Sequence, residues 1–189
     1  MRCNQVIDTG VSLMEAIYVP KKLVDEARKM GIDISELVLN AIANVLDLDP
    51  SEVASARLEL AEKSLEEARE FIKQRNAVQA SEKLYKAVEE CIKALAEVFN
   101  ASQLKEVRKR GKWDTWLLGM AATDLSKRLG EERIRLAWKD AYDIHVWGFH
   151  EAKYRVEDVE AALPLAEWLL SYTKQVISEK LREHKEKQE

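Results

Sequence analysis

Apolar side chains recur with the period of an α-helix along most of the chain. From Ala54 to Ile72 they follow one another at alternating intervals of four and three residues, and a second stripe extends from Leu84 to Phe99. Stripes of this spacing bury one face of a helix against a neighbour. The link around Asn76, a candidate helix cap, is one to three residues long, so the two predicted helices must run antiparallel.

Three further helices are predicted downstream, at residues 114–129, 131–147 and from 156 onward. Asp114 is the predicted cap of the first of them, and Gly130 is its predicted stop. Pro164 removes a backbone donor and predicts a kink in the last helix. That helix is expected to fray in the charged tail from Lys180 onward. Residues 101–113 break the apolar pattern and are predicted to form an interhelical loop.

The first fifty residues differ from the rest. Residues 15–20 form a short β-leaning run that ends at a proline, and the helix-forming residues 21–30 stop at Gly31. Asp33 with Glu36 three residues later has the spacing of a capping box and opens a second helix. This segment therefore predicts a short extended stretch followed by a helical hairpin.

The predicted fold class is all-α. We expect an up-down antiparallel helical bundle of four to five long helices at residues 49–180, with a small N-terminal appendage at 1–48 and a charged tail at 181–189. The composition supports this fold, because the 189 residues include only 6 Gly and 3 Pro, with 47% hydrophobic and 34% charged residues. These proportions exclude a β-sandwich, a collagen-like repeat and a disordered chain.

Charge and cysteine usage indicate the compartment. The formal net charge of −4 excludes a generally cationic nucleic-acid surface and leaves room only for a local basic patch. No run approaches the roughly 20 apolar residues of a membrane span, and the first residues lack the apolar region of a signal peptide. Cys3 and Cys91 lie far apart, and Cys91 falls on an apolar stripe as a small hydrophobe. We expect a reduced, cytoplasmic protein without a membrane partner.

The sequence motifs of common enzyme classes are missing. The chain contains no glycine-rich phosphate loop, no His-Glu-x-x-His, no Cys-x-x-Cys and no Gly-x-Ser-x-Gly. The Glu-x-x-His pairs of di-iron bundles do not occur either, and there are only 3 histidines. We therefore expect no metal site and no cofactor.

Aromatic and histidine residues concentrate between residues 138 and 154. This segment holds two of the three histidines, two of the five tryptophans and two of the five tyrosines. Such rings either clamp a ligand or fill the end of a bundle, and both interpretations remain open. The predicted ligand contacts are Tyr142, Trp147, His150 and Tyr154. His145 falls on the apolar side of its helix, where a core histidine is the alternative to a functional one.

Three stretches carry a family resemblance: residues 80–96, 141–151 and 156–162. The chain from about residue 52 to 174 resembles the HEPN superfamily of helical bundles and is most similar to its archaeal PaREP branch. The resemblance implies a bundle that dimerises through its long helices. It also implies a role as a metal-independent ribonuclease, or as the partner of a nucleotidyltransferase in a toxin–antitoxin pair.

The active motif of such ribonucleases is an Arg, a polar residue and, a few positions later, a His, with both subunits contributing. Lys139, Asp140 and His145 match this spacing, but Lys139 stands where the motif has Arg. Lysine is a point charge and does not replace the planar fork that arginine offers to phosphate oxygens. Six positions also place Lys139 and His145 roughly 120° apart on one helix, so they converge only across a two-fold axis.

Two main functions therefore remain as expectations, beside a structural partner that does not bind RNA and an N-terminal DNA-binding module. The first is a non-catalytic homodimeric bundle that binds a nucleotide, an RNA or a protein partner. The alternative is a ribonuclease toxin in which His145 acts as base or acid and Lys139 clamps the phosphate. The sequence favours the first, because of the lysine in the motif.

The break at residues 101–113 is also a candidate phosphate-binding segment. It carries the basic residues Lys105, Arg108, Lys109, Arg110 and Lys112, of which Arg108, Lys109 and Arg110 are the predicted ligand contacts. Trp113 and Trp116 follow directly and have the chemistry to stack on bases. The alternative is a solvated loop followed by two core tryptophans.

The N-terminal segment at residues 15–42 is similar to antitoxin ribbon-helix-helix modules. In those modules a ribbon from a dimer reads the major groove with outward polar side chains. The outward residues here would be Met14, Ala16 and Tyr18, none of which reads base edges. Residues 1–50 also carry five basic against eight acidic residues, which disfavours phosphate binding. We expect a dimerisation element rather than a sequence-specific DNA reader.

Overall fold

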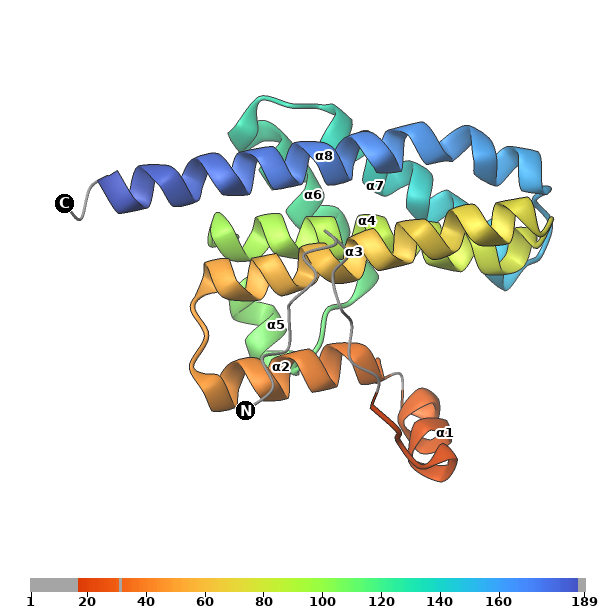
Figure 1. Cartoon of the computed structure of the whole chain (residues 1–189), viewed down its shortest axis with the longest axis horizontal. Helices are drawn as coiled ribbons and strands as arrows, with labels where there is room; N and C mark the ends of the chain where they lie inside the picture. Colours follow the sequence, from red (N-terminus) through yellow and green to blue (C-terminus); the bar gives the residue numbers. More distant parts are fainter. Residues whose placement is uncertain (1–16, 31, 187–189) are drawn as a thin grey trace, which may run out of the picture. The chain divides into compact units, whose positions relative to one another are not determined.

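The described structure, a computed structural model, consists of helices joined by short links (Figure 1). It covers residues 17–30 and 32–186; the predicted outward residues Met14 and Ala16, the stop at Gly31 and Cys3 lie outside these ranges. Within them the elements are α1 (Lys21–Lys29), α2 (Ile34–Leu46), α3 (Pro50–Lys73), α4 (Ala77–Val98), α5 (Leu104–Arg110), α6 (Thr115–Leu129), α7 (Arg133–Ile144), the π-helix η1 (His145–His150) and α8 (Val156–Glu186). No strand occurs in these ranges, which confirms the all-α prediction.

The chain divides into two compact units, residues 1–34 and 35–189. The described part of the first unit contains α1, and residues 17–20 before it form neither helix nor strand. The second unit contains the bundle together with almost all of α2. The appendage was expected to end at residue 48, whereas by compactness α2 belongs with the bundle.

The α3–α4 hairpin forms as the apolar stripes predict. The Asp49 side chain accepts from the backbone N–H groups of Ser51 and Glu52. The Glu52 carboxylate in turn accepts from the Asp49 backbone N–H, which completes a capping box. Arg75 turns the chain with a φ of 59°, and the Asn76 side chain caps α4. The two helices lie side by side and antiparallel (Figure 1).

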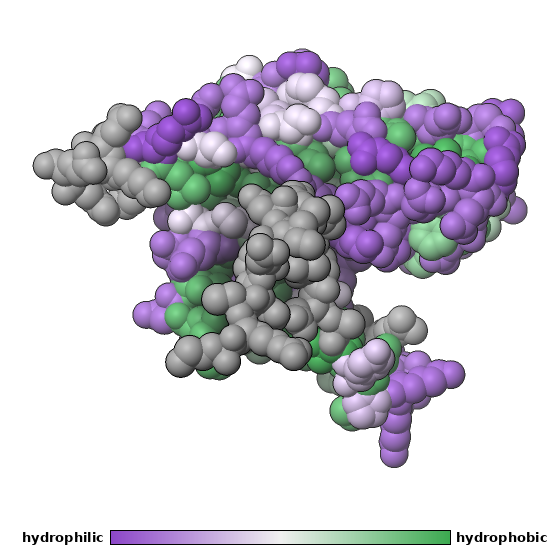
Figure 2. Space-filling view, viewed as in Figure 1, coloured by the Kyte–Doolittle hydropathy of each residue, from purple (hydrophilic) through white to green (hydrophobic). Residues whose placement is uncertain are grey.

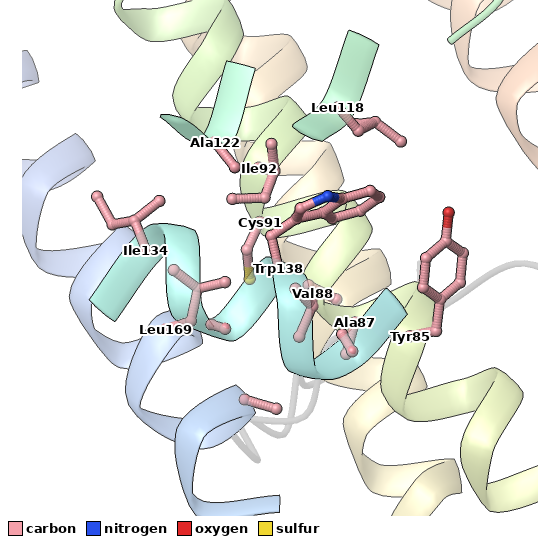
Figure 3. Packing of buried hydrophobic residues seen from close by; sticks show 14 of the residues in the cluster. Tyr85, Ala87, Val88, Cys91, Ile92, Leu118, Ala122, Ile134, Trp138 and Leu169 are labelled. Atoms are coloured by element: carbon pink, nitrogen blue, oxygen red, sulfur yellow. The ribbon is translucent and has the colours of Figure 1, made fainter. Parts of the chain in front are cut away.

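Helix α4 is the centre of the bundle, because α3, α6, α7, α8 and η1 all pack against it. Figure 3 shows Val88 and Ile92 of α4 among side chains from α6, α7 and α8, including Trp138 and Leu169. Cys91 is 1% exposed in the same cluster, and burial raises the pKa of its thiol well above the ordinary range. The interpretation of Cys91 as a small core hydrophobe is confirmed.

Two local predictions are wrong. Residues 104–110 are helical rather than a loop, because buried Leu104 anchors a short helix that Gly111 ends with a φ of 73°. Seven residues are too few to show a helical period in the sequence. Asp114 occupies the N-cap of α6 but does not cap it, because its carboxylate pairs with Arg110 at 3.2 Å.

The C-terminal half also differs from expectation in two places. The predicted helix 131–147 changes at Ile144 from an α-helix to the π-helix η1. Helix α8 contains Pro164 and remains helical to Glu186, well into the expected tail.

The surface follows the charged composition. Seen from the direction of Figure 1, it is mostly hydrophilic with smaller hydrophobic patches (Figure 2). Helix α2 leaves large apolar side chains exposed, among them Leu37, Ile42, Val45 and Leu46. No helix in the described part of the chain is long and apolar enough to cross a bilayer.

Candidate functional site

The π-helix η1 brings the two histidines of the aromatic segment together. Residues five positions apart in an α-helix point about 140° away from each other. A π-turn hydrogen-bonds residue i to i+5, as Glu151 N–H does to the Val146 carbonyl at 2.9 Å, and so returns the fifth residue to the same side. The Nε2 atoms of His145 and His150 consequently lie 3.0 Å apart.

Gly148 allows this turn to sit against α4. A Cβ atom at position 148 would lie 2.1 Å from Oγ and 2.8 Å from Cβ of Ser81. Any larger residue would therefore push η1 away from α4. The buried Ser81 hydroxyl donates to the Ala77 carbonyl of its own helix, which holds the side chain in place.

His145 is largely enclosed by neighbouring side chains. Its ring stacks on Tyr85 at a centroid distance of 4.0 Å and on Phe149 at 5.5 Å. Its Nδ1 atom lies 2.9 Å from Oε2 of Glu82, and both atoms are buried without a hydrogen bond of good geometry to any described residue. The side chain of His145 is only 13% exposed. Glu82, Tyr85, His145, Phe149 and His150 form what we call the histidine cluster.

The histidine cluster is a chain of polar groups that leads from α4 to solvent. The Glu82 carboxylate contacts one nitrogen of His145, the other nitrogen of His145 contacts His150, and His150 is exposed. One of the two facing ring nitrogens must donate and the other accept, so the rings share a proton between them. Burial raises the pKa of Tyr85 far above its ordinary value, which keeps the phenol beneath His145 neutral.

Exposed rings surround the cluster. Tyr142 is 42% exposed and stacks on the buried Trp138, while Trp147 is 46% exposed. The Tyr154 hydroxyl donates to Asp143, and this hydrogen bond raises the pKa of Tyr154 to about 12. Tyr154 thus fastens the segment after η1 to α7.

Lys139 and Asp140 do not join the cluster in one copy of the chain. Lys139 is exposed on α7, and within the described ranges no hydrogen bond or ion pair links it to His145 or His150. Asp140 is half-buried, and burial together with the neighbouring Asp143 raises its pKa. The three predicted catalytic residues therefore do not converge within a single chain.

The predicted phosphate-binding residues of α5 differ from one another. Arg110 is engaged by Glu106 at 2.8 Å and by Asp114, and its guanidinium lies 5.2 Å from the ring centroid of Trp116. Arg108 and Lys109 are exposed, and neither forms an ion pair with another described residue. The two tryptophans also separate, because Trp113 packs partly against the core and Trp116 is 49% exposed.

A buried ionic network was not foreseen from the sequence. Arg57, 1% exposed, contacts Glu36 at 2.7 Å and Glu90 at 2.8 Å. Lys93, 2% exposed, contacts Glu36 at 2.6 Å, Glu90 at 2.8 Å and Glu89 at 2.9 Å. We call these five residues the ionic network. The available signal was that Arg57 lies within the apolar stripe, three residues after Ala54.

The charges of the ionic network hold one another ionised. Burial alone would raise the pKa of Glu36, but Arg57 and Lys93 hold it well below its usual range. Burial likewise opposes the charge of Lys93, whose three carboxylate neighbours raise its pKa well above the ordinary value. Lys86 completes the balance with a contact to Glu89 at 3.0 Å. The described part of the chain contains no group of three or more residues able to hold a metal ion.

The molecule is thus an all-helical bundle protein built around α4, with one polar cluster open to solvent and one sealed inside. Residues 56–170 match the archaeal PaREP1/PaREP8 family, and the chain belongs to that family. A crystal structure of a protein from Sulfolobus solfataricus is similar, with 34% sequence identity and a TM-score of 0.56. The match covers 61% of this chain and 94% of that one. Comparison with curated proteins finds no match.

Proposed function

We propose that the chain is a non-catalytic binding protein that holds single-stranded RNA on the exposed rings of α7 and η1. One observation carries the proposal. His145 is largely buried: each ring nitrogen lies against a neighbouring side chain, and its ring stacks on Tyr85 and Phe149. Tyr142, Trp147 and His150 in the same segment are exposed. Exposed aromatic rings are the platform on which unpaired bases stack.

The charge around these rings favours stacking over attraction to phosphates. Exposed Lys139 and Lys153 stand beside the acidic residues Asp140, Asp143 and Glu151, so the surface has little net charge. Binding that rests on phosphate neutralisation weakens steeply as salt rises. RNA binding at η1 is therefore expected to have a shallow salt dependence and little sequence preference.

The proposal also includes the HEPN superfamily and a homodimeric state. The PaREP1/PaREP8 match supports a HEPN-like bundle, and the resemblance to that superfamily supports a homodimer formed through the long helices. In such a dimer the protein would serve a toxin–antitoxin pair or a nucleotidyltransferase as its RNA-holding component. Sedimentation analysis of the purified chain tests the homodimer directly.

The RNA proposal is tested with two matched tryptophans. Fluorescence anisotropy of a labelled single-stranded RNA is measured with wild type, Trp147→Ala and Trp116→Ala, because the two rings are similarly exposed at 46% and 49%. Stacking of one base contributes about 1–3 kcal/mol, so Trp147→Ala should weaken binding roughly 5- to 150-fold. Trp116→Ala should leave it unchanged. Loss of binding in Trp116→Ala alone would refute the assignment to η1.

A second candidate function is favoured by the polar chain Glu82–His145–His150. A carboxylate that orients one imidazole, with a second imidazole exposed to substrate, is a general acid–base arrangement. The candidate is a metal-independent ribonuclease in which His150 faces the RNA. It is tested by incubating labelled RNA in EDTA with wild type, His150→Ala and His145→Ala. Cleavage that persists unchanged in both variants contradicts the mechanism.

A further inference from the structure

A cavity of about 390 Å³ lies between α2, α3, the C-terminal end of α4 and α5. It is separate from the histidine cluster: Glu82 and Glu97 lie 15 residues apart on α4, or about 22 Å at the rise of an α-helix. Its size is within the range of small-ligand sites. The residues that argue for a ligand are Glu36, Asn40, Arg57, Glu97, Arg108 and Trp113.

Two opposite charges, Glu97 and Arg108, line this cavity and interact electrostatically without a direct ion pair. Neither Glu97 nor Arg108 forms a hydrogen bond or ion pair with any residue that the structure describes. Nearby, Glu36 and Arg57 are paired with each other at 2.7 Å. Burial raises the pKa of Glu97 although Arg57 and Arg108 oppose the shift. The cavity thus offers a half-buried carboxyl and an exposed guanidinium, neither of them hydrogen-bonded to a described side chain.

The cavity lining also includes the buried Arg57 and a large aromatic ring. Arg57 lies 1% exposed at the cavity, and its Nε atom is buried without a hydrogen-bond partner. Trp113 contributes a large flat ring, and Leu104, Val107 and Val53 add apolar surface. An occupant must therefore combine a flat ring, N–H donors for Glu97 and an anionic group for Arg108.

We propose that this cavity binds a guanine nucleotide. Guanine presents two neighbouring N–H donors on one edge, which match the two oxygens of the Glu97 carboxylate, while its face stacks on Trp113. The phosphate pairs with Arg108, and exposed Lys105 and Lys109 on α5 strengthen the local positive field. Adenine fits less well, because an acceptor nitrogen stands beside its single amino group and would face the carboxylate.

This site is independent of the RNA proposal for η1. Glu36 and Asn40 of the cavity belong to α2, which precedes the range that matches the family at residues 56–170. The same guanine chemistry is available in a free nucleotide and in a guanine of an RNA chain. The experiment must distinguish these two sources.

The test is isothermal titration calorimetry of the full chain with GMP, AMP, ribose 5-phosphate and an oligoguanylate. GMP should bind at least tenfold more tightly than AMP. Glu97→Gln should weaken GMP at least tenfold and leave ribose 5-phosphate unchanged, because the amide of Gln opposes the guanine donors. Arg108→Gln should weaken both. Tighter binding of the oligoguanylate than of GMP assigns the site to RNA, and the reverse assigns it to a free nucleotide.

Two controls keep the result specific. Lys127→Gln removes an exposed charge of α6 that does not line the cavity, and it should leave GMP binding unchanged. Trp147→Ala alters η1 and should have no effect on GMP, so failure of the RNA proposal and failure of this one are separable. Thermal unfolding of each variant shows whether it is folded. Absence of GMP binding, equal affinity for GMP and AMP, or full affinity in folded Glu97→Gln overturns the proposal.

Discussion

The two polar clusters that share α4 contain similar residues but differ in their exposure to solvent. The histidine cluster near the start of the helix places Glu82 against an imidazole chain that reaches solvent through His150. The ionic network further along places Glu89 and Glu90 against Lys93 and Arg57, which are sealed from water. The first reaches the surface of the molecule at His150. The second is fixed in charge and has a structural role.

The sealed network explains how α2 is attached. No described residue of α2 is buried, and its Glu36 pairs with Arg57 on α3 and Lys93 on α4. Taking charges out of water is costly, and close pairing offsets this only while every partner is present. The network therefore specifies where α2 lies rather than adding much net stability.

The largest effect is expected from breaking the sealed network. Arg57→Met removes a buried cation that Glu36 and Glu90 share, and the free energy of unfolding should fall by about 3–5 kcal/mol. Urea denaturation measures the loss. The matched control is the charge-free combination Glu36→Gln, Arg57→Met, Glu90→Gln and Lys93→Met, which should be less destabilised than Arg57→Met alone. If Arg57→Met were as stable as wild type, the buried ion pairs of Arg57 would not be needed for stability.

The next largest effect is expected at Gly148, where the turn that carries the histidine cluster packs against α4. Gly148→Ala places a methyl group against Ser81 and should destabilise the chain by about 1–3 kcal/mol, as overpacking does. Ser81→Gly removes both atoms that would clash, so a double-mutant cycle should recover much of the loss. Additive effects in this cycle would mean that the close approach of η1 and α4 is not the cause.

The ionic network should make the stability of the bundle depend on pH in the acid range. The pKa of Glu36 is lowered in the folded state, so its contribution is complete above the unfolded value, 4.5, and disappears as the pH falls through the folded value. The loss should be on the order of 2 kcal/mol. Glu36→Gln should be less stable than wild type at pH 7 but show a flatter acid limb below about pH 5 in urea titrations. If the stability of wild type and of Glu36→Gln fell equally steeply with acid, the pKa of Glu36 would not be lowered in the folded state.

The smallest effect is expected at the exposed charges of α5. Arg110 pairs with Glu106 and Asp114 while remaining 44% exposed, and solvent screens surface pairs of this kind so that they contribute little to stability. Arg110→Gln should therefore change the urea midpoint only slightly, in contrast to Arg57→Met. A loss as large as that of Arg57→Met would erase the distinction between exposed and sealed pairs.

Local patterns predicted what local forces determine. The α3–α4 hairpin, the cap at Asn76 and the stop at Gly130 follow from apolar spacing and from residues that act within a few positions of themselves. The π-turn was not predicted, and its close approach to α4 needs a glycine at position 148 because Ser81 lies on a helix distant in sequence. The sequence predicted separate roles for His145 and His150, and the π-turn brings their rings into contact.

The ionic network and the cavity required the fold for the same reason. Arg57 and Glu36 lie 21 positions apart and on different helices, so no periodic pattern relates them. The short α5, which places Arg108 and Trp113 at the cavity, is too brief to show a period. Prediction thus fails where a polar residue finds its partner across the bundle.

The short link at Arg75 also has a kinetic consequence. Helices α3 and α4 form the most extensive contact in the bundle and are neighbours in sequence, so closing the loop between them costs little chain entropy. Helix α8 must instead return from a distant part of the chain to reach the same partners. We expect the hairpin to dominate the folding transition state and α8 to dock last, an order that φ-values on Leu65 and Leu169 would reveal.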